Sequence, residues 1–210
     1  MSQKPLLGWS TRTYDLVSSV YDLFLRLTFP MAAKAQRRVA HGLQPAASIL
    51  DVACGTGSVL AMAAESGLEC FGNDLSTGMI RRAQRKVPTA EFHQGSFYEL
   101  PYPDDTFDFV VETNALSGYG INTEKALREM LRVCKPGGQV RIGDYAKAPA
   151  ETFWTRVTER CMLWFGDQAC NFVALLKGLG YESDPEILGW GGLYQYVSAI
   201  KHPQKMVTSL

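Results

Sequence analysis

The sequence predicts an α/β fold: a doubly wound, mostly parallel seven-stranded sheet with an antiparallel last strand, and an N-terminal helical lid. From residue 48 onward, short apolar segments alternate with amphipathic ones, and such alternation gives parallel strands joined by right-handed helical crossovers. The Gly-Trp-Gly-Gly at 189–192 favours a tight reversal, so the strand that follows should run antiparallel. The length of 210 residues fits a single domain.

Two helices are expected before the sheet begins. Apolar residues recur at helical spacing over 14–29, and Pro30 ends this stretch. A second helix is expected over 31–42. We therefore divide the chain into an N-terminal helical lid, 1–45, and a core, 46–210, within one domain overall.

The core alternates between strands and helices along its length. Strands are expected at 48–53, 69–74, 90–94, 107–112, 139–145, 182–188 and 193–200. Helices are expected at 58–66, 77–87, 123–135, 151–165 and 167–177. Ser76 stands at the N-cap position of the second core helix, where its hydroxyl can accept a hydrogen bond from a backbone N–H of the first turn.

The charges of the chain cancel, with 21 lysines and arginines against 21 aspartates and glutamates. A nucleic-acid-binding domain usually carries a clear positive excess, so no nucleic-acid partner is expected. Low net charge also makes self-association plausible, and the oligomeric state stays open. The first 45 residues nevertheless hold six basic and two acidic residues. Basic amphipathic helices can lie on membrane surfaces, so a peripheral membrane contact through the N-terminal helices is expected, with a solvated helix face as the alternative.

The five cysteines are widely and irregularly spaced, and none forms a Cys-x-x-Cys pair. This pattern favours reduced structural thiols over disulfides, and no metal site is expected. The N-terminal residues lack the apolar stretch of a signal peptide, and no apolar run is long enough to span a bilayer. The sequence therefore predicts a cytoplasmic protein.

A glycine-containing turn follows the first core strand and leads into a helix. The turn reads Asp51-Val-Ala-Cys-Gly55-Thr-Gly57, and its glycines let a ligand approach the backbone at the end of a strand. Asp74 ends the second strand, where a carboxylate can accept both hydroxyl hydrogens of a ribose. Leu60 stands where a G-x-G-x-x-G fingerprint requires its third glycine, and a phosphate-binding G-x-x-x-x-G-K-[ST] is absent. NAD and ATP are therefore not expected.

Four sequence motifs occur in order between residues 45 and 146. They are ILDVACGTGS, GNDLSTGM, LPYPDDTFDFVV and LREMLRVCKPGGQV. Together they resemble the Rossmann-like, class I S-adenosylmethionine-dependent methyltransferases, and the resemblance implies S-adenosyl-L-methionine as the cofactor. It implies that Asp51 contacts the amino-acid end of the cofactor, that Ala53, Gly55 and Gly57 lie beneath it, that Asp74 binds the ribose, and that Leu75 and Met79 line the adenine.

The sequence departs from the family pattern at two places. The third strand leads into Gly95-Ser96-Phe97 where relatives have Gly-Asp-Ala. Ser96 can still accept a hydrogen bond from the adenine, and Phe97 can stack on the base. After the fourth strand, Leu116-Ser117 replaces the Leu-His of many relatives. Asn114 is counted among the cofactor contacts, but an Asn-Pro-Pro-Tyr motif typical of base-flipping methyltransferases is absent there.

The start of the chain gives information on the methyl acceptor. Tyr14-Asp15 and Tyr21-Asp22 resemble the lead-in of ubiquinone/menaquinone C-methyltransferases and of bacterial phosphatidylethanolamine N-methyltransferases. The resemblance implies that this helix closes over the cofactor and that Tyr14 and Tyr21 face the transferred methyl group, with core packing as the alternative. Asp144, where the fifth strand ends, is the candidate polar residue at the acceptor.

These observations favour a methyltransferase acting on an amphiphilic or small apolar acceptor. A phospholipid amine head group and a quinol are the preferred classes. One alternative is an O-, N- or S-methyltransferase of small metabolites without a membrane role. Another is a protein that binds the cofactor but has lost catalysis and serves as a scaffold. The acceptor atom, and whether a general base takes part, stay open because an in-line methyl transfer depends first on positioning.

Overall fold

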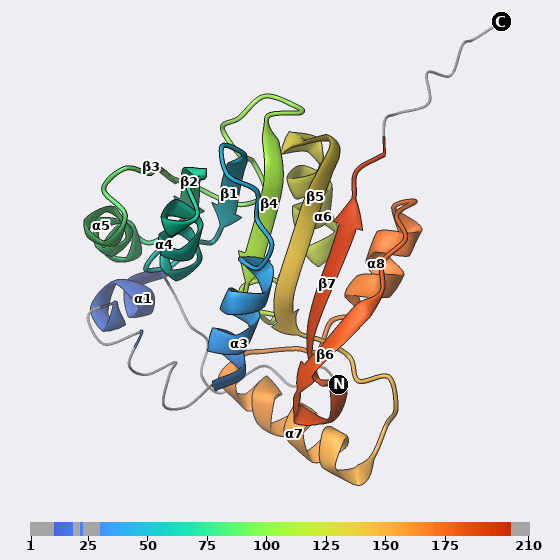
Figure 1. Ribbon diagram of the computed structural model, residues 1–210. Coiled ribbons are helices and arrows are strands. Elements are labelled where there is room, and N and C mark those ends of the chain that lie inside the picture. Colours follow the sequence, from blue (N-terminus) through green and yellow to red (C-terminus); the bar gives the residue numbers. More distant parts are fainter. Residues whose placement is uncertain (1–10, 19–21, 23–29, 203–210) are drawn as a thin grey trace, which may run out of the picture.

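The computed structural model describes residues 11–18, 22 and 30–202. Its centre is one seven-stranded sheet in the order β3-β2-β1-β4-β5-β7-β6 (Figure 1). The strands are β1 (Ser48–Val52), β2 (Glu69–Asp74), β3 (Glu91–Gln94), β4 (Phe107–Thr113), β5 (Cys134–Tyr145), β6 (Pro185–Gly189) and β7 (Tyr194–Ile200). The α/β fold class with a doubly wound seven-stranded sheet is thereby confirmed.

The strand directions place the ligand-binding edge of the sheet. Strands β1 to β5 pair in parallel, whereas β7 lies between β5 and β6 and runs antiparallel to both. The antiparallel last strand is thus confirmed. The chain order reverses between β1 and β4, and in doubly wound folds the crevice beyond the carboxyl ends of the strands at such a point binds ligands.

Helices cover both faces of the sheet. One face packs against α3 and α4, and the other against α6 and α8. The helices are α1 (Thr11–Val17), α3 (Pro30–Val39), α4 (Ser58–Glu65), α5 (Thr77–Lys86), α6 (Thr123–Val133), α7 (Phe153–Phe165) and α8 (Phe172–Gly178), with a 3-10 turn at Trp190–Gly192. Strand β1 is buried on both faces, which explains its continuous apolar run. In Figure 1, α1 and α7 lie at the end of the sheet to which the parallel strands point.

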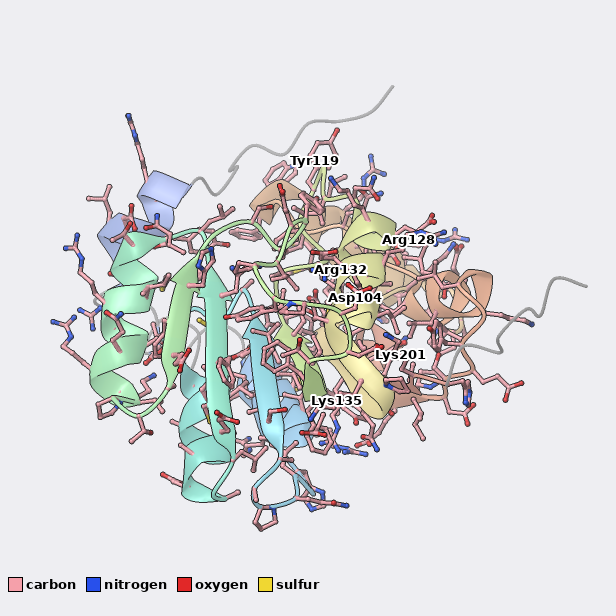
Figure 2. All side chains as sticks on the ribbon, turned by 90° about the horizontal axis from the view of Figure 1, so that it is seen from above. Asp104, Tyr119, Arg128, Arg132, Lys135 and Lys201 are labelled. Atoms are coloured by element: carbon pink, nitrogen blue, oxygen red, sulfur yellow. The ribbon has the colours of Figure 1, made fainter. Side chains whose placement is uncertain are left out.

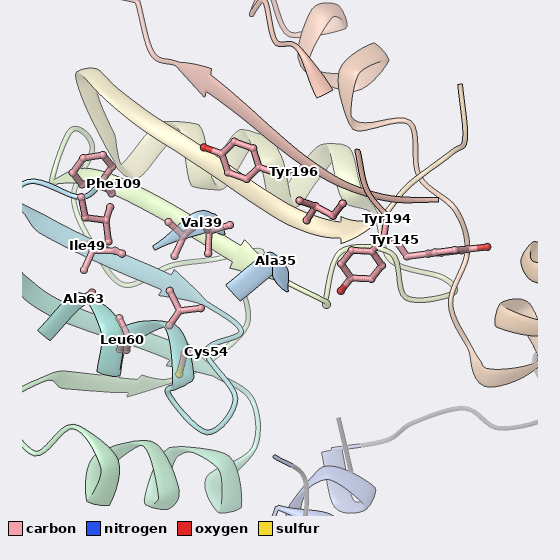
Figure 3. Close-up of a cluster of buried hydrophobic side chains, with 14 of the residues drawn as sticks. Ala35, Val39, Ile49, Cys54, Leu60, Ala63, Phe109, Tyr145, Tyr194 and Tyr196 are labelled. Atoms are coloured by element: carbon pink, nitrogen blue, oxygen red, sulfur yellow. The ribbon is translucent and has the colours of Figure 1, made fainter. Parts of the chain in front are cut away.

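Helix α3 is an integral part of one of these layers. Ala35 and Val39 are fully buried beside residues of α4 and β4 (Figure 3). A Cβ atom on Gly143 of β5 would lie 2.8 Å from the Cβ of Ala35, so the glycine permits this close approach. The guanidinium of Arg141 donates hydrogen bonds to the carbonyls of Val39 (2.9 Å) and His41 (2.8 Å). The boundary at residue 45 stays a prediction.

Three elements differ most from the ranges expected from sequence. The last helix begins at Phe172 instead of 167, because the side chain of Asn171 caps it and accepts a hydrogen bond from Ala174 N (3.0 Å). Strand β5 starts directly after α6, and its pairing with β4 shifts register between Phe107 and Phe109. Of the helix expected over 14–29, the structure describes residues 14–18 and residue 22. Within this part, α1 ends at Val17. Among the described helices, none has the length and apolarity needed to cross a bilayer.

Candidate active site

A cavity of about 300 Å³ opens at the carboxyl ends of β1, β2 and β4. This volume is at the small end of the range of ligand pockets. Five parts of the chain meet there: the loops after β1, β2, β3 and β4, and the segment that follows α7. Helix α1 contributes Tyr14 to the wall. The cavity therefore lies at the point where a doubly wound sheet binds its ligand.

The backbone around the cavity adopts the left-handed conformation at several positions. Ala53 has φ 56°, Gly55 has φ 52° and Asn114 has φ 63°, and all three line the cavity. A Cβ on Gly55 would meet nothing within 4 Å, so this residue leaves an open cradle beside the ligand. Gly57 (φ 77°) does not line the cavity. A Cβ there would approach Ala83 of α5 to 3.0 Å, so Gly57 serves the packing of α4 against α5.

Asp74 lines the cavity where β2 ends. One carboxylate oxygen accepts a hydrogen bond from Gly55 N and the other from Ser76 N, both at 2.8 Å. Burial raises the pKa of this carboxyl group, and these backbone hydrogen bonds oppose the rise. Each carboxylate oxygen can accept a second hydrogen bond, so both remain able to receive a ribose hydroxyl. The side chain of Ser76 caps α5 as expected, because it accepts a hydrogen bond from Met79 N (3.1 Å).

Asp51 of β1 is only 1% exposed and is not among the residues that line the cavity. Its Oδ1 has no hydrogen-bond partner among the described residues, and neither side-chain polar atom of neighbouring Asn73 has one. Burial first, and the charge of Asp74 second, raise the pKa of Asp51 well above its usual value. A buried carboxylate without a donor is costly, so this atom fits a positively charged or hydrogen-bonding ligand group.

The residues expected at the adenine divide into two groups. Leu75, Met79 and Phe97 line the cavity and give it apolar walls. Ser96 is not among the lining residues, and its hydroxyl accepts a hydrogen bond from Tyr98 N (3.2 Å). The adenine contacts of all four residues stay predictions.

The N-terminal segment is fixed to the core by its two aspartates. Asp15 accepts hydrogen bonds from Ser76 Oγ (2.6 Å) and Gly78 N (2.8 Å) at the start of α5. Asp22 accepts from Thr56 Oγ1 (2.5 Å) and pairs with Lys86 (2.7 Å). Of the two aspartates, Asp15 belongs to α1 and holds this helix against the start of α5.

Of the two tyrosines in the same motif, the structure describes Tyr14 but not Tyr21. Tyr14 is half-buried and lines the cavity. Burial raises its pKa to about 12, with further contributions from the negative charges of Asp167, Asp74 and Asp144, so the phenol stays protonated at neutral pH. Tyr21 lies outside the described residues, and its role stays a prediction.

Asp144 is fully enclosed and does not line the cavity. Its carboxylate accepts hydrogen bonds from the backbone of Leu116 (2.9 Å), Ser117 (2.9 Å) and Tyr145 (2.6 Å), and from Ser117 Oγ (2.8 Å). Burial raises its pKa to about 6, and these hydrogen bonds limit the rise. The structure thus gives Asp144 the position of a residue that supports the loop after β4, while a contact with the acceptor stays a prediction.

The sequence had not indicated Tyr119 or Asp167, which both line the cavity. The helix expected over 167–177 includes Asp167, but α8 begins at Phe172, so Asp167 lies in the segment between α7 and α8. The only local signal was Gly166 itself, whose φ of 97° ends α7.

A second cavity, of about 410 Å³, lies away from this edge. Its charged groups are satisfied within the protein: Arg132 pairs with Asp104 and Glu129, and Lys201 pairs with Asp105. Figure 2 shows Asp104, Arg132 and Lys201 on one side of the molecule, away from Tyr119. The charged residues that line this second cavity therefore stabilise the fold through ion pairs. Among the described residues, no group of His, Cys, Asp and Glu side chains could hold a metal ion.

The glycine turn after β1, the carboxylate that ends β2 and the strand order define the class I fold of S-adenosylmethionine-dependent methyltransferases. Residues 50–142 match a family described as a methyltransferase domain, and this part of the chain carries the class I sheet. Its cofactor is S-adenosyl-L-methionine. The open cradle at Gly55, the free lone pairs of Asp74 and the unpaired Oδ1 of Asp51 fit this cofactor.

Among known proteins, the chain is similar to the demethylmenaquinone methyltransferase of Renibacterium salmoninarum. The two are 34% identical over 152 residues, which are 71% of this chain and 64% of that protein, so the chain spans less than two thirds of this relative. A chain in the complex containing the Haloferax volcanii Trm112 methyltransferase activator has a TM-score of 0.73 at 17% identity and covers 90% of this chain and 98% of that one.

A third similar protein is the Haemonchus contortus phosphoethanolamine N-methyltransferase 2 in complex with phosphomonomethylethanolamine and S-adenosylhomocysteine. It has a TM-score of 0.65 at 18% identity, covering 83% of this chain and 53% of that one. At such identities the two solved structures show a shared fold alone.

Proposed function

We propose that this chain transfers a methyl group from S-adenosylmethionine to an aromatic quinol. The observation that carries the proposal is the cavity at the carboxyl ends of β1, β2 and β4, whose walls combine cofactor-type polar groups with aromatic and apolar side chains. The 34% identity to a demethylmenaquinone methyltransferase supports a quinol over the other acceptors. A phospholipid amine has no comparable support and is not proposed further.

The residues divide the work within this cavity. S-adenosylmethionine supplies an electrophilic methyl group on a positively charged sulfur. Asp74 would receive the ribose hydroxyls, and Asp51 would receive the amino group directly or through a water molecule. Tyr14 and Tyr119 line the cavity with apolar ring surface that suits a flat aromatic acceptor. Holding acceptor and methyl group in line is the main contribution that such a site makes to the rate.

The test is transfer of radiolabelled methyl groups from S-adenosylmethionine. A naphthoquinol lacking its ring methyl group, phosphatidylethanolamine in vesicles, and the water-soluble fraction of a cell extract serve as parallel acceptors. We expect label in the naphthoquinol and none in the lipid. Label confined to the water-soluble fraction would instead favour a methyltransferase of small metabolites. Cofactor binding without any transfer would favour a scaffold.

We further propose that the protein meets its lipophilic acceptor at an anionic membrane surface. The basic N-terminal helices were the expected contact, but Lys34 donates to the carbonyl of Leu188 (2.7 Å) and Arg38 pairs with Glu186 (2.5 Å). Exposed Arg37 has no such contact within the described residues. Helix α7 exposes Trp154 (73%) and Trp164 (62%), and its end leads directly into the cavity wall. Tryptophan favours the interface between water and lipid.

Flotation with anionic vesicles distinguishes the two surfaces. Replacing Trp154 and Trp164 together by alanine should weaken binding on the order of tenfold or more, because the loss of buried apolar area exceeds about 1.4 kcal/mol. Arg37→Glu should have a smaller effect that disappears at high salt. Vesicle binding that depends on Arg37 alone would indicate that α3 makes the membrane contact. Absence of flotation at low salt would refute the membrane proposal.

A further inference from the structure

Asp167 lines the cavity, and neither the fold nor the cofactor explains its carboxylate group. Asp167 follows α7 and lines the cavity together with Gly166. No hydrogen bond or ion pair joins its carboxylate to any other described residue, although the residue is partly buried. Buried carboxylates in folded proteins usually have such partners. This group is therefore available to a ligand.

The backbone holds Asp167 firmly in this position. Its N–H donates to the carbonyl of Met162 (3.0 Å), and it forms an antiparallel bridge with Gly118 in the loop after β4. On either side, Tyr119 N donates to Gly166 O and Gln168 N donates to Ser117 O, both at 2.7 Å. These backbone contacts fix the position of Asp167 against the loop after β4.

The surroundings of Asp167 raise the pKa of its carboxyl group into the neutral range. Burial first, and the negative charge of Asp144 of β5 second, raise the pKa of Asp167 to about 7. Tyr14 of α1 and Tyr145 of β5 also interact electrostatically with it. None of the described cations lowers this pKa. A carboxyl group with a pKa near the working pH has the property that an efficient general base needs.

We propose that Asp167 is the general base of the reaction and accepts the proton from a hydroxyl group of the aromatic acceptor. This inference rests on the proposed quinol methylation. Tyr14, whose phenol keeps its proton, would donate a hydrogen bond in the same cavity and orient the acceptor. Asp167 and Tyr119 line the same cavity as Gly55 and Asp74, the residues expected to hold the cofactor, so one cavity contains both the proposed base and the cofactor residues.

The acceptor O–H bond breaks, its proton goes to the Asp167 carboxylate, and the electron pair stays on the acceptor. The adjacent ring carbon then forms a bond to the methyl group as the carbon–sulfur bond breaks and its electron pair goes to sulfur. Loss of the proton from that ring carbon to solvent restores the aromatic ring, and the proton held by Asp167 returns to the acceptor oxygen. One methyl group is gained and one proton is released in total.

The first test is the pH profile of methyl transfer to the naphthoquinol. In the wild type, kcat should rise with pH as Asp167 loses its proton. Asp167→Asn should lower kcat by about 10²- to 10⁴-fold, the usual contribution of a general base, and remove this rise. Asp167→Glu should restore part of the rate, and the affinity for S-adenosylmethionine should change little in both variants. Gln168→Ala, an exposed neighbour, is the matched control with unchanged kcat.

A second readout does not need the cofactor. 1-Naphthol, used as a probe, should bind the cofactor-free protein, and its affinity should increase with pH from 5 to 8 in the wild type and stay level in Asp167→Asn. A kcat and pH profile unchanged by Asp167→Asn would overturn the proposal. So would absent naphthol binding, or binding that ignores both pH and the substitution. Failure of the wild type to methylate the naphthoquinol at all would refute the proposed function, and the naphthol titration would still decide on Asp167.

Discussion

Replacing Asp74 by alanine is expected to weaken the binding of S-adenosylmethionine by on the order of 100-fold or more. Two hydrogen bonds from ribose hydroxyls to a charged carboxylate would be lost, and each such bond contributes about 1.5–3 kcal/mol. The loss also frees the backbone N–H groups of Gly55 and Ser76, which Asp74 holds at 2.8 Å. Isothermal titration calorimetry measures the change directly.

Two variants make this experiment specific. Asp74→Asn keeps one acceptor oxygen and should lose less affinity than Asp74→Ala. Glu69→Gln removes an exposed carboxylate at the start of the same strand and should bind like the wild type. The wild type should show no heat of binding with NAD. An unchanged affinity in Asp74→Ala would contradict the placement of the ribose at this residue, and tight binding of NAD would contradict the cofactor assignment.

Replacing Asp144 by alanine is expected to lower the free energy of unfolding by about 3–5 kcal/mol. Its carboxylate receives four hydrogen bonds, three of them from backbone N–H groups that would remain buried without a partner. Urea denaturation monitored by circular dichroism measures this loss. Ser117→Ala removes one of the four donors and leaves the carboxylate in place, so its cost should be about 1 kcal/mol.

The same variant separates support from acceptor binding. If Asp144 supports the loop after β4, stability falls and any change in activity accompanies that loss. If Asp144 contacts the acceptor, Asp144→Ala would keep most of its stability and raise KM for the acceptor. A loss of less than about 1 kcal/mol in the free energy of unfolding, together with a raised KM, would therefore contradict the structural role of Asp144. It would instead support a contact between Asp144 and the acceptor.

The sequence alone was sufficient where the signal is local. The alternation of strands and helices predicted the sheet, and the Gly-Trp-Gly-Gly turn predicted the antiparallel last strand. The positions of Gly55 and Asp74 at strand ends predicted where the cavity would lie. These features depend on backbone conformation, on hydrophobic periodicity and on the rule that parallel strands end at one edge, and all three are readable over a few consecutive residues.

The tertiary structure decided what depends on contacts between distant residues. Gly57 packs against Ala83, and Asp144 accepts hydrogen bonds from the loop after β4. Arg38 pairs with Glu186, 148 positions away in the sequence. Asp167 reaches the cavity because α8 begins only at Phe172 and the segment between α7 and α8 pairs with Gly118. A charge or a carboxylate in the sequence shows which chemistry is available, but its partner, its burial and hence its pKa are set by the packing of the whole chain.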